Sequence, residues 1–286
     1  MGSEEDWVVE HINDAFGFRT ALKAVGGVRM IDSAQQLAVF ENPTFGRVMI
    51  LDGAYQITTA DEFVYHEMMA HVPLFAHGAA RDVLVIGGGD GGVAREILRH
   101  DTVRSLTMVE IDRAVVDLAL EIFPEVSAGA FDDPRLALVI DDGAAFAARA
   151  EGRYDVIIVD APDPIGAGAA LFTPAFYAGC RAMLRPGGVM VTQSGMPFLA
   201  ADWLPGHAAN LRSVFADVAF FLTTVPTYTG GPMAHGFSTD DAALKAVPVE
   251  VLAERHARTG LRMRYWSPQV HSAAFALPPY VEAVVG

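Results

Sequence analysis

Acidic residues follow four apolar segments of this chain, at the points where buried strands would end. The segments are residues 83–86, 105–109, 136–140 and 154–159. Ligands of open α/β sheets bind at the carboxyl ends of the strands, so side chains at these positions share one edge of the sheet. We therefore expect a single cleft to be lined by the acids that follow the strands, namely Asp90, Glu110, Asp142, Asp160 and Asp163.

The first of these strands runs into a glycine-rich turn, Gly87–Gly92, which precedes a predicted helix. Such a turn lets a ligand approach the backbone beside a helix N-terminus, as in nucleotide-binding sites. Asp90 inside the turn disfavours a pyrophosphate and suits a ligand with positive charge. Glu110, about twenty residues further on, is typical of an acid that binds ribose hydroxyls. Asp142 is placed to meet an adenine amino group, to cap the following helix, or to do both.

Asp160 and Asp163 lie three residues apart, before a loop rich in glycine and proline. Two interpretations of the clustered carboxylates remain open at this point. The carboxylates could bind Mg²⁺ or Ca²⁺ through their oxygens, or they could hold an amine whose proton one of them accepts. Spacing alone does not separate the two.

The elements that must position these residues fall into two parts. Residues 28–58 contain short strand-like segments separated by turns, and a helix is predicted over 61–77, with Asp61 as its N-cap and Gly78 just past its end. From residue 81 onward strands and helices alternate, which predicts a doubly wound parallel sheet completed by further signals in the last third of the chain. The predicted fold is an α/β protein with a small N-terminal β-sheet domain (1–64) and a larger domain (65–286).

The composition excludes several classes of protein. There are 35 acidic against 20 basic residues, and residues 51–165 alone hold 21 acids and 8 bases. No nucleic-acid partner is expected, because phosphate binding needs a local excess of Lys and Arg. No apolar run reaches the length of a membrane span, so no membrane partner is expected either. The single cysteine, Cys180, excludes an internal disulfide, fits a reducing cytoplasm, and is predicted to be buried.

Taken together, the motifs resemble a known family. The segments YHEMMAHVPLFAHG, VLVIGGGDGGVAREILRH, MVEID and YDVIIVDAPDPIGAGAALFTPAFY are similar to those of bacterial spermidine synthase, a polyamine aminopropyltransferase. The likeness extends from about Trp7 to Tyr280. It implies a Rossmann-like sheet of the class I methyltransferase type beside the small N-terminal β-sheet. It also implies a homodimer or homotetramer, paired through hydrophobic edges of the N-terminal strands, and we favour a symmetric dimer.

The resemblance implies a chemistry for the cleft. Members of the family transfer the aminopropyl group of decarboxylated S-adenosylmethionine to putrescine and release methylthioadenosine, with no metal and no permanently bound cofactor. Asp160 is then the general base that takes a proton from the amine, and Tyr65 orients it. Because a carboxylate of ordinary pKa is a weak base for an ammonium group, we expect burial beside Asp90 and Asp163 to raise the pKa of Asp160.

The ligand contacts are likewise implied by the resemblance, position by position. The nucleoside co-substrate is implied to bind through Gln35, Gly87, Asp90, Glu110, Asp142, Gly143 and Ala167. The acceptor amine is implied to bind along His66, Asp90, Asp160, Asp163 and Tyr228. The segment 164–172, rich in glycine and alanine, matches the mobile loop that covers the site in the family.

This chain departs from the family near the amine. Pro162 stands where Ser or Thr is usual, Ala167 replaces a proline, Thr229 a tyrosine and Phe237 a tryptophan. Putrescine remains the expected acceptor, with cadaverine, agmatine and spermidine as alternatives. Two other functions compete with this one: a methyltransferase that uses intact S-adenosylmethionine, and a catalytically idle polyamine-binding protein.

Overall fold

The computed structural model describes residues 6–11, 14, 17–31, 36–149, 153–164 and 166–286. Its strands are β1 (Trp7–Glu10), β2 (Thr20–Lys23), β3 (Val25–Ile31), β4 (Leu37–Asn42), β5 (Gly46–Leu51), β6 (Ala54–Thr58), β7 (Asp82–Gly87), β8 (Ser105–Glu110), β9 (Leu136–Ile140), β10 (Tyr154–Asp160), β11 (Leu184–Gln193), β12 (Asp217–Thr223) and β13 (Met233–Thr239). Its α-helices are α1 (Glu62–His77), α2 (Gly92–Leu98), α3 (Arg113–Ile122), α4 (Pro124–Ser127), α5 (Gly143–Arg149), α6 (Pro174–Met183), α7 (Leu204–Arg212), α8 (Val249–Thr259), α9 (Pro268–Ala274) and α10 (Pro279–Val285). Three short 3₁₀ helices are η3 (Ala130–Asp132), η4 (Gly166–Phe172) and η5 (Leu244–Ala246).

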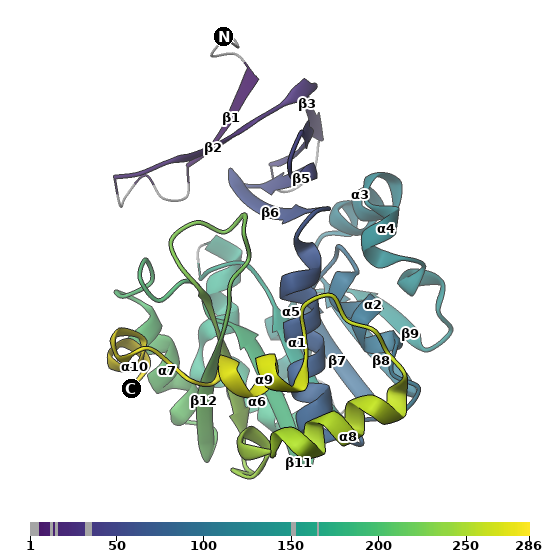
Figure 1. Cartoon of the computed structure of the whole chain (residues 1–286), viewed down its shortest axis with the longest axis vertical. Helices are drawn as coiled ribbons and strands as arrows, with labels where there is room; N and C mark the ends of the chain where they lie inside the picture. The colour runs from purple at the N-terminus through teal and green to yellow at the C-terminus, as the bar shows by residue number, and fades with distance from the viewer. Residues whose placement is uncertain (1–5, 12–13, 15–16, 32–35, 150–152, 165) are drawn as a thin grey trace.

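A seven-stranded sheet in the order β12-β13-β11-β10-β7-β8-β9 forms the centre of the molecule (Figure 1). Strands β7 to β11 pair in parallel, and β13 and β12 extend the sheet antiparallel at one edge. The central strands are nearly continuous apolar runs, because helices cover both faces of a parallel sheet. The four strands predicted from apolar segments are confirmed, and the later strand signals do complete the sheet.

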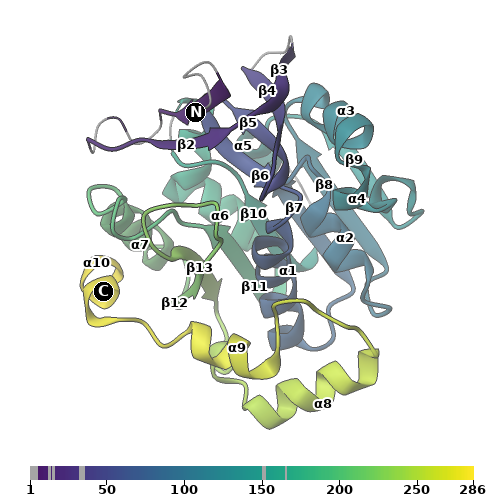
Figure 2. The same cartoon turned by 45° about the horizontal axis from the view of Figure 1, so that its top comes forward.

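Helices pack on both faces of this sheet (Figure 2). One core joins β7, β10 and β11 to α1 and α2, and the C-terminal segment around α8 and α9 packs against α1 from outside. The opposite core lies under α5, α6, α7 and α10. Cys180 lies in this second core, fully buried and unpaired, as predicted. The predicted doubly wound α/β fold is therefore confirmed.

The N-terminal strands form a separate antiparallel sheet, β3-β4-β5-β6, over the end of the main sheet (Figure 1). Leu37, Val39 and Met49 of this sheet pack against Val115 and Leu118 of α3. A two-stranded ribbon, β1 with β2, was not predicted from the sequence. The predicted division into residues 1–64 and 65–286 places its boundary in the first turn of α1 and stays a prediction.

Helix α1 spans Glu62–His77 and ends at Gly78, whose φ of 76° is left-handed, as predicted for its C-terminus. Asp61 occupies the N-cap position, as predicted, but its side chain makes no capping hydrogen bond. The Asp61 carboxylate instead accepts hydrogen bonds from Thr58 Oγ1, at 2.6 Å, and from the backbone N–H of Thr227, at 2.8 Å. Asp61 thus ties the start of α1 to the loop between β12 and β13.

One helix in the last third of the chain was missed by the sequence patterns. Helix α7 was not predicted, since Pro205 and Gly206 near its start look like turn residues in the sequence. Proline is tolerated in the first helical turn, where its missing N–H would have no partner. None of the helices in the described ranges is long and apolar enough to cross a membrane.

Candidate active site

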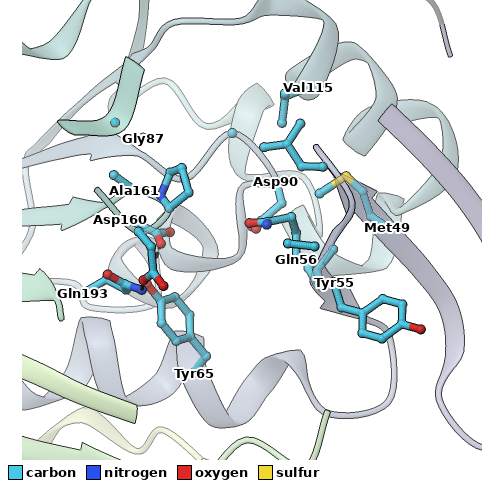
Figure 3. Close-up of a pocket in the computed structure, with 18 of the residues that line it drawn as sticks. Met49, Tyr55, Gln56, Tyr65, Gly87, Asp90, Val115, Asp160, Ala161 and Gln193 are labelled. Atoms are coloured by element: carbon cyan, nitrogen blue, oxygen red, sulfur yellow. Dashed lines mark hydrogen bonds between the residues drawn. The ribbon is translucent and has the colours of Figure 1, made fainter. Parts of the chain in front are cut away.

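A cavity lies at the carboxyl ends of β7, β8 and β10, between the main sheet and strands β5 and β6 (Figure 3). All the acids predicted to share one cleft line it, namely Asp90, Glu110, Asp142, Asp160 and Asp163. Other predicted site residues line it as well: Tyr65, His66, Gly87, Gly143 and Tyr228. Gln35 lies outside the described residues. Ala167 falls in η4, where the neighbouring Gly168 lines the cavity.

The glycine turn brings Asp90 and Asp160 to the same place. Strands β7 and β10 pair in parallel with Gly87 opposite Asp160, and the Gly88 N–H donates a 3.0 Å hydrogen bond to the Asp160 carbonyl. A Cβ added to Gly87 would lie 1.9 Å from that carbonyl oxygen, and the φ of Gly87 is +87°. Only glycine fits this position, because both the φ and the close approach exclude a side chain.

Asp160 is held by a tyrosine from α1. The Tyr65 hydroxyl donates a 2.6 Å hydrogen bond to Asp160 Oδ1, and Figure 3 shows the ring of Tyr65 directed toward this carboxylate. Burial and the charge of Asp90 raise the pKa of Asp160 to about 6, although Tyr65 and His66 act in the opposite direction. The direction agrees with the sequence-based expectation. The further acid that contributes is Glu110, where the sequence suggested Asp163.

Asp90 is held by the start of α2 and by His66. Its Oδ1 accepts a 2.6 Å hydrogen bond from the Gly92 N–H and lies 3.5 Å from His66 Nε2. Burial favours the protonated form of Asp90, but the positive His66 outweighs it and lowers the pKa of Asp90. In turn, burial opposes the charge on His66, yet Asp90 and Glu62 raise its pKa to about 10. His66 and Asp90 therefore form an ion pair within the cavity wall.

Asp163 is held by Gln193, the last residue of β11. The Gln193 side-chain amide donates a 2.8 Å hydrogen bond to Asp163 Oδ1, and burial raises the pKa of Asp163. Sequence reasoning missed Gln193. The signal was available, because Gln193 is a polar residue at the carboxyl end of a parallel strand, the same edge that delivers the acids.

The three acids at the centre of the cavity share one arrangement. In Asp90, Asp160 and Asp163, Oδ1 accepts a hydrogen bond from the protein. Within the described residues, no hydrogen bond reaches Oδ2 of any of them. Each carboxylate is therefore fixed through one oxygen and has the other available for a ligand. Carboxylate oxygens that accept no hydrogen bond from the described residues are suited to bind the ammonium groups of a ligand.

Glu110 and Asp142 lie on another side of the cavity. Both oxygens of Glu110 accept backbone hydrogen bonds, from Gly89 at 3.1 Å and from Asp112 at 3.0 Å, and burial raises its pKa. Asp142 Oδ1 accepts a 2.8 Å hydrogen bond from the Ala145 N–H, so Asp142 does cap α5. The apolar residues Ile86, Val109 and Leu171 also line the cavity.

The positions at which the sequence departs from the family pattern divide into two kinds. Pro162 and Thr229 line the cavity, and Thr229 Oγ1 is buried with no hydrogen-bond partner among the described residues. Phe237 does not belong to the cavity wall. It is fully buried on β13, where its ring meets Phe275 edge to face at 5.5 Å. The suggestion that Phe237 alters the amine channel is therefore wrong.

Tyr228 closes the cavity against the N-terminal sheet. Its hydroxyl donates to the carbonyl of Gln56 on β6, and its ring meets Tyr65 edge to face at 6.4 Å. Burial raises the pKa of Tyr228 well above its usual range. Among the described side chains, no group of three or more His, Cys, Asp or Glu has the arrangement of a metal site.

Comparisons with known proteins agree over nearly the whole chain. The sequence pattern of a family described as "Spermine/spermidine synthase domain" matches residues 62–246, and that of the "Spermidine synthase tetramerisation domain" matches residues 32–59. Polyamine aminopropyltransferase from Escherichia fergusonii is 48% identical over 282 residues, which cover 99% of this chain and 97% of the relative. Polyamine aminopropyltransferase 1 from Pseudomonas aeruginosa is 51% identical over 252 residues, or 88% of each chain.

Solved structures of similar proteins share the fold. A spermidine synthase in complex with the transition state analogue AdoDATO superposes with a TM-score of 0.91 at 34% identity, covering 100% of this chain and 97% of the other. Spermidine synthase from Thermotoga maritima gives a TM-score of 0.88 at 33% identity, covering 100% and 96%.

Proposed function

The chain belongs to the spermine/spermidine synthase family of polyamine aminopropyltransferases, and we propose that it transfers the aminopropyl group of decarboxylated S-adenosylmethionine to putrescine, with Asp160 as the general base. The observation that carries the proposal is the half-buried Asp160 carboxylate, fixed by Tyr65 through Oδ1 and available at Oδ2. The similarity to a spermidine synthase bound to a transition state analogue supports the same cavity as the place of reaction.

The role of Asp160 is to remove a proton from the attacking amine, so that the nitrogen lone pair is free to react. An alkylamine has a pKa of about 10.4, so almost every molecule is protonated at pH 7. The pKa of Asp160, about 6, lies about 4 units below that of the amine, which corresponds to about 6 kcal/mol for the proton transfer. For an Asp of ordinary pKa this difference is larger. Proximity of the amine to the sulfonium lowers the amine's own pKa further. The Asp160 carboxylate is thus adapted to act as a base near neutral pH.

The bond changes in the proposed reaction balance without a metal or a covalent enzyme intermediate. Asp160 Oδ2 takes one proton from the amine, and the freed nitrogen lone pair attacks the methylene carbon beside the sulfonium. The carbon–sulfur bond breaks, and its electron pair neutralises the sulfur in methylthioadenosine. The protein's part is to position the two substrates and to remove the proton.

Asp90 gives a reason to prefer the decarboxylated co-substrate. Its ionised carboxylate, with Oδ2 available, would hold the amino end of the aminopropyl group. Intact S-adenosylmethionine carries a carboxylate on the carbon that bears this amine, and that negative charge would face Asp90 across a poorly screened gap. Glu110 would bind the ribose, and Asp142 with Gly143 the adenine. We also propose that Gln35, Gly87 and Ala167 contact the nucleoside co-substrate, as the family resemblance implies.

Putrescine is the acceptor we propose, bound between Asp160, Asp163, His66 and Tyr228. The Thr229 hydroxyl lies in the same wall and has no hydrogen-bond partner among the described residues, so an amine with an additional polar group would bind there differently from putrescine. Agmatine and spermidine carry such a group and cadaverine differs in length alone, so these are the amines to compare with putrescine.

The proposal extends to the assembly and the location. We propose a homodimer or homotetramer formed through the N-terminal strands. The exposed apolar side chains there support this, with Trp7 49%, Val25 53% and Met30 67% exposed, and so does the tetramerisation-domain match. Light scattering at micromolar concentration tests the assembly, and a monodisperse monomer would contradict it. A cytoplasmic location stays a prediction from the single buried cysteine.

One assay separates the candidate functions. The protein is incubated with either decarboxylated or intact S-adenosylmethionine and with each amine in turn, and methylthioadenosine is measured. We expect methylthioadenosine only with the decarboxylated compound, and fastest with putrescine. Methylated product from intact S-adenosylmethionine would support a methyltransferase instead. Amine binding without any product would support an idle polyamine-binding protein.

A further inference from the structure

Arg95, Glu62, His66 and Asp90 form a row of alternating charges, and the proposed reaction gives no role to Arg95 or Glu62. Glu62 Oε2 is 2.5 Å from His66 Nδ1, and Arg95 donates to the same oxygen at 2.9 Å and to Glu62 Oε1 at 3.2 Å. The order toward the cavity is Arg95, Glu62, His66 and Asp90, and Arg95 is the half-buried end of the row. Glu62 and His66 are only 8% and 3% exposed, so water screens these charges little.

The ring of His66 packs closely against Gly92. A Cβ added to Gly92 would lie 2.2 Å from its ring atoms, which shows how tightly the ring fits against the start of α2. Glu62 and Asp90 lie at opposite nitrogens of the ring, so a ring that donates to both must carry two protons. A neutral ring that donates to residue 62 would turn a lone pair toward the Asp90 carboxylate.

We infer that Glu62, clamped by Arg95, is a positioning residue for the aminopropyl donor, because it keeps His66 doubly protonated and thereby fixes Asp90. With Gly92 and His66 both on Oδ1, Asp90 presents Oδ2 to the amino end of the donor. Glu62 acts through His66 and Asp90, although it also reaches the cavity wall. This inference rests on the proposed function, since it names the donor that Asp90 holds.

The groups that face His66 come from every element packed around it, and their net effect supports the inference. Burial lowers the pKa of His66, but Asp90 of the glycine turn and, after it, Glu62 of α1 raise this pKa to about 10. Asp160 of β10 also interacts electrostatically with His66, and Arg95 of α2 interacts with Glu62 and Asp90. Removing the charge of Glu62 takes away one of the two carboxylates that hold the proton, and Asp90 alone remains to oppose burial.

The test substitutes Glu62 by Gln, which keeps the size of the side chain and removes its charge. We expect E62Q to raise the KM for decarboxylated S-adenosylmethionine by about tenfold, to raise the KM for the amine by a smaller factor because His66 also belongs to the proposed amine site, and to change kcat by less than about twofold. The matched control is E67Q on the same helix, where a buried carboxylate contacts backbone N–H groups instead of the cavity. E67Q should lower the melting temperature and leave the KM for the donor unchanged.

A double variant separates positioning from a merely structural role. In H66Q the amide NH₂ can donate to Asp90 without an extra proton, so the charge of Glu62 is no longer needed to keep a donor at this position. The double variant E62Q/H66Q should therefore have a KM for the donor within about threefold of H66Q alone, because effects on one pathway are not additive. A KM that rises by the same factor in both backgrounds would overturn the inference.

A second readout needs no turnover. In the free protein with ¹⁵N-labelled histidine, the His66 signals are assigned by their loss in H66Q and followed from pH 5 to pH 10. We expect both ring nitrogens to stay protonated well above neutral pH in the native protein and in E67Q, and to lose a proton at lower pH in E62Q. An unchanged titration in E62Q would overturn the inference even if the enzyme transfers aminopropyl groups. Failure of the donor to react would instead contradict the proposed function and leave this titration intact.

Discussion

Helix α1 carries two buried clusters built from the same kinds of residues, and only one of them faces the cavity. The front cluster is Glu62, His66, Asp90 and Asp160. The back cluster is Glu67, His71, Glu96 and His100, which lies between α1, α2 and the segment before α9. Every residue of the back cluster is at most 5% exposed. Glu62 and His66 of the front cluster are also buried, at 8% and 3% exposed, so burial cannot by itself explain the difference between the histidines of the two clusters.

The clusters differ in how burial and charge balance at their histidines. His66 has a carboxylate at each ring nitrogen, and its pKa rises to about 10 despite burial. His71 has one carboxylate, Glu96, which two arginines also share, and burial lowers the pKa of His71. Burial and His71 lower the pKa of His100 to about 3. The front cluster is thus charged, and the imidazoles of the back cluster are neutral.

The clusters also differ in how fully their oxygens are used. The Glu67 carboxylate accepts three backbone hydrogen bonds, from Arg264 at 2.7 Å, Tyr265 at 2.8 Å and Trp266 at 2.7 Å. In the front cluster, Asp90 and Asp160 each have one oxygen that no described residue contacts by a hydrogen bond. Polar groups that are fully paired hold a fold together, whereas an unpaired oxygen beside a cavity is available to a substrate.

The largest effect should come from the front cluster at Asp160. Replacing Asp160 by Asn removes the proton acceptor, and we expect kcat to fall by about 10³-fold, the usual weight of a general base. Binding of methylthioadenosine, measured by calorimetry, should be retained, because the proposed nucleoside contacts come from Glu110 and Asp142. Turnover within about threefold of the native enzyme would remove Asp160 from its assigned role.

The same variant provides its own control for folding. The pKa of Asp160 is raised in the folded state, so the folded protein favours the protonated carboxyl, and ionisation costs stability as the pH rises through about 6. An amide avoids this cost. We expect Asp160→Asn to melt at a higher temperature than the native protein at pH 8, which excludes misfolding as the cause of lost activity.

The next effect should come from the back cluster at Glu67. Replacing Glu67 by Ala leaves three backbone N–H groups without their acceptor, and we expect the free energy of unfolding to fall by about 3 kcal/mol. Denaturant unfolding measures this loss. The KM values of the remaining folded enzyme should not change, and a selective change in either KM would show that the back cluster also serves the cavity.

A smaller effect should appear in the pH profile of the front cluster. Asp160 acts as a base only when ionised, so kcat/KM should fall as the pH drops through about 6. The Tyr65 hydrogen bond favours the ionised carboxylate. Tyr65→Phe should therefore move this fall to higher pH and lower kcat/KM at pH 7 by about tenfold. A fall that moves to lower pH would contradict the hydrogen bond's assigned effect.

The smallest effect at neutral pH should come from His100 in the back cluster, because its contribution to stability changes only as the pH falls below 6.5. The pKa of His100 is about 3 in the folded protein and about 6.5 when unfolded, so folding favours the neutral ring. Its contribution is complete above pH 6.5 and is lost as the pH falls toward 3. We expect His100→Asn to reduce the slope of unfolding free energy against pH in this window by about 1 kcal/mol per pH unit. An equal slope in urea titrations of both proteins would contradict the lowered pKa of His100.

The sequence by itself determined which acids meet at the cavity. Asp90, Glu110, Asp142 and Asp160 each follow an apolar run, and parallel strands place their carboxyl ends at one edge whatever the details of packing. Local patterns also determined the end of α1 at Gly78 and the burial of Cys180. These features depend on neighbours in the chain or on a rule of topology, and both are visible in a sequence.

Only the tertiary structure decided how those acids are held. Arg95 reaches Glu62 across 33 positions, and Gln193 reaches Asp163 across 30, through the packing of α1 on α2 and of β11 beside β10. Because of the same packing, the Asp61 side chain bonds to Thr227 and does not cap α1, and Phe237 lies outside the cavity wall. A periodic pattern shows that a side chain is buried, but not which distant group it meets. The balance between burial and charge that separates His66 from His71 is therefore decided by three-dimensional contacts alone.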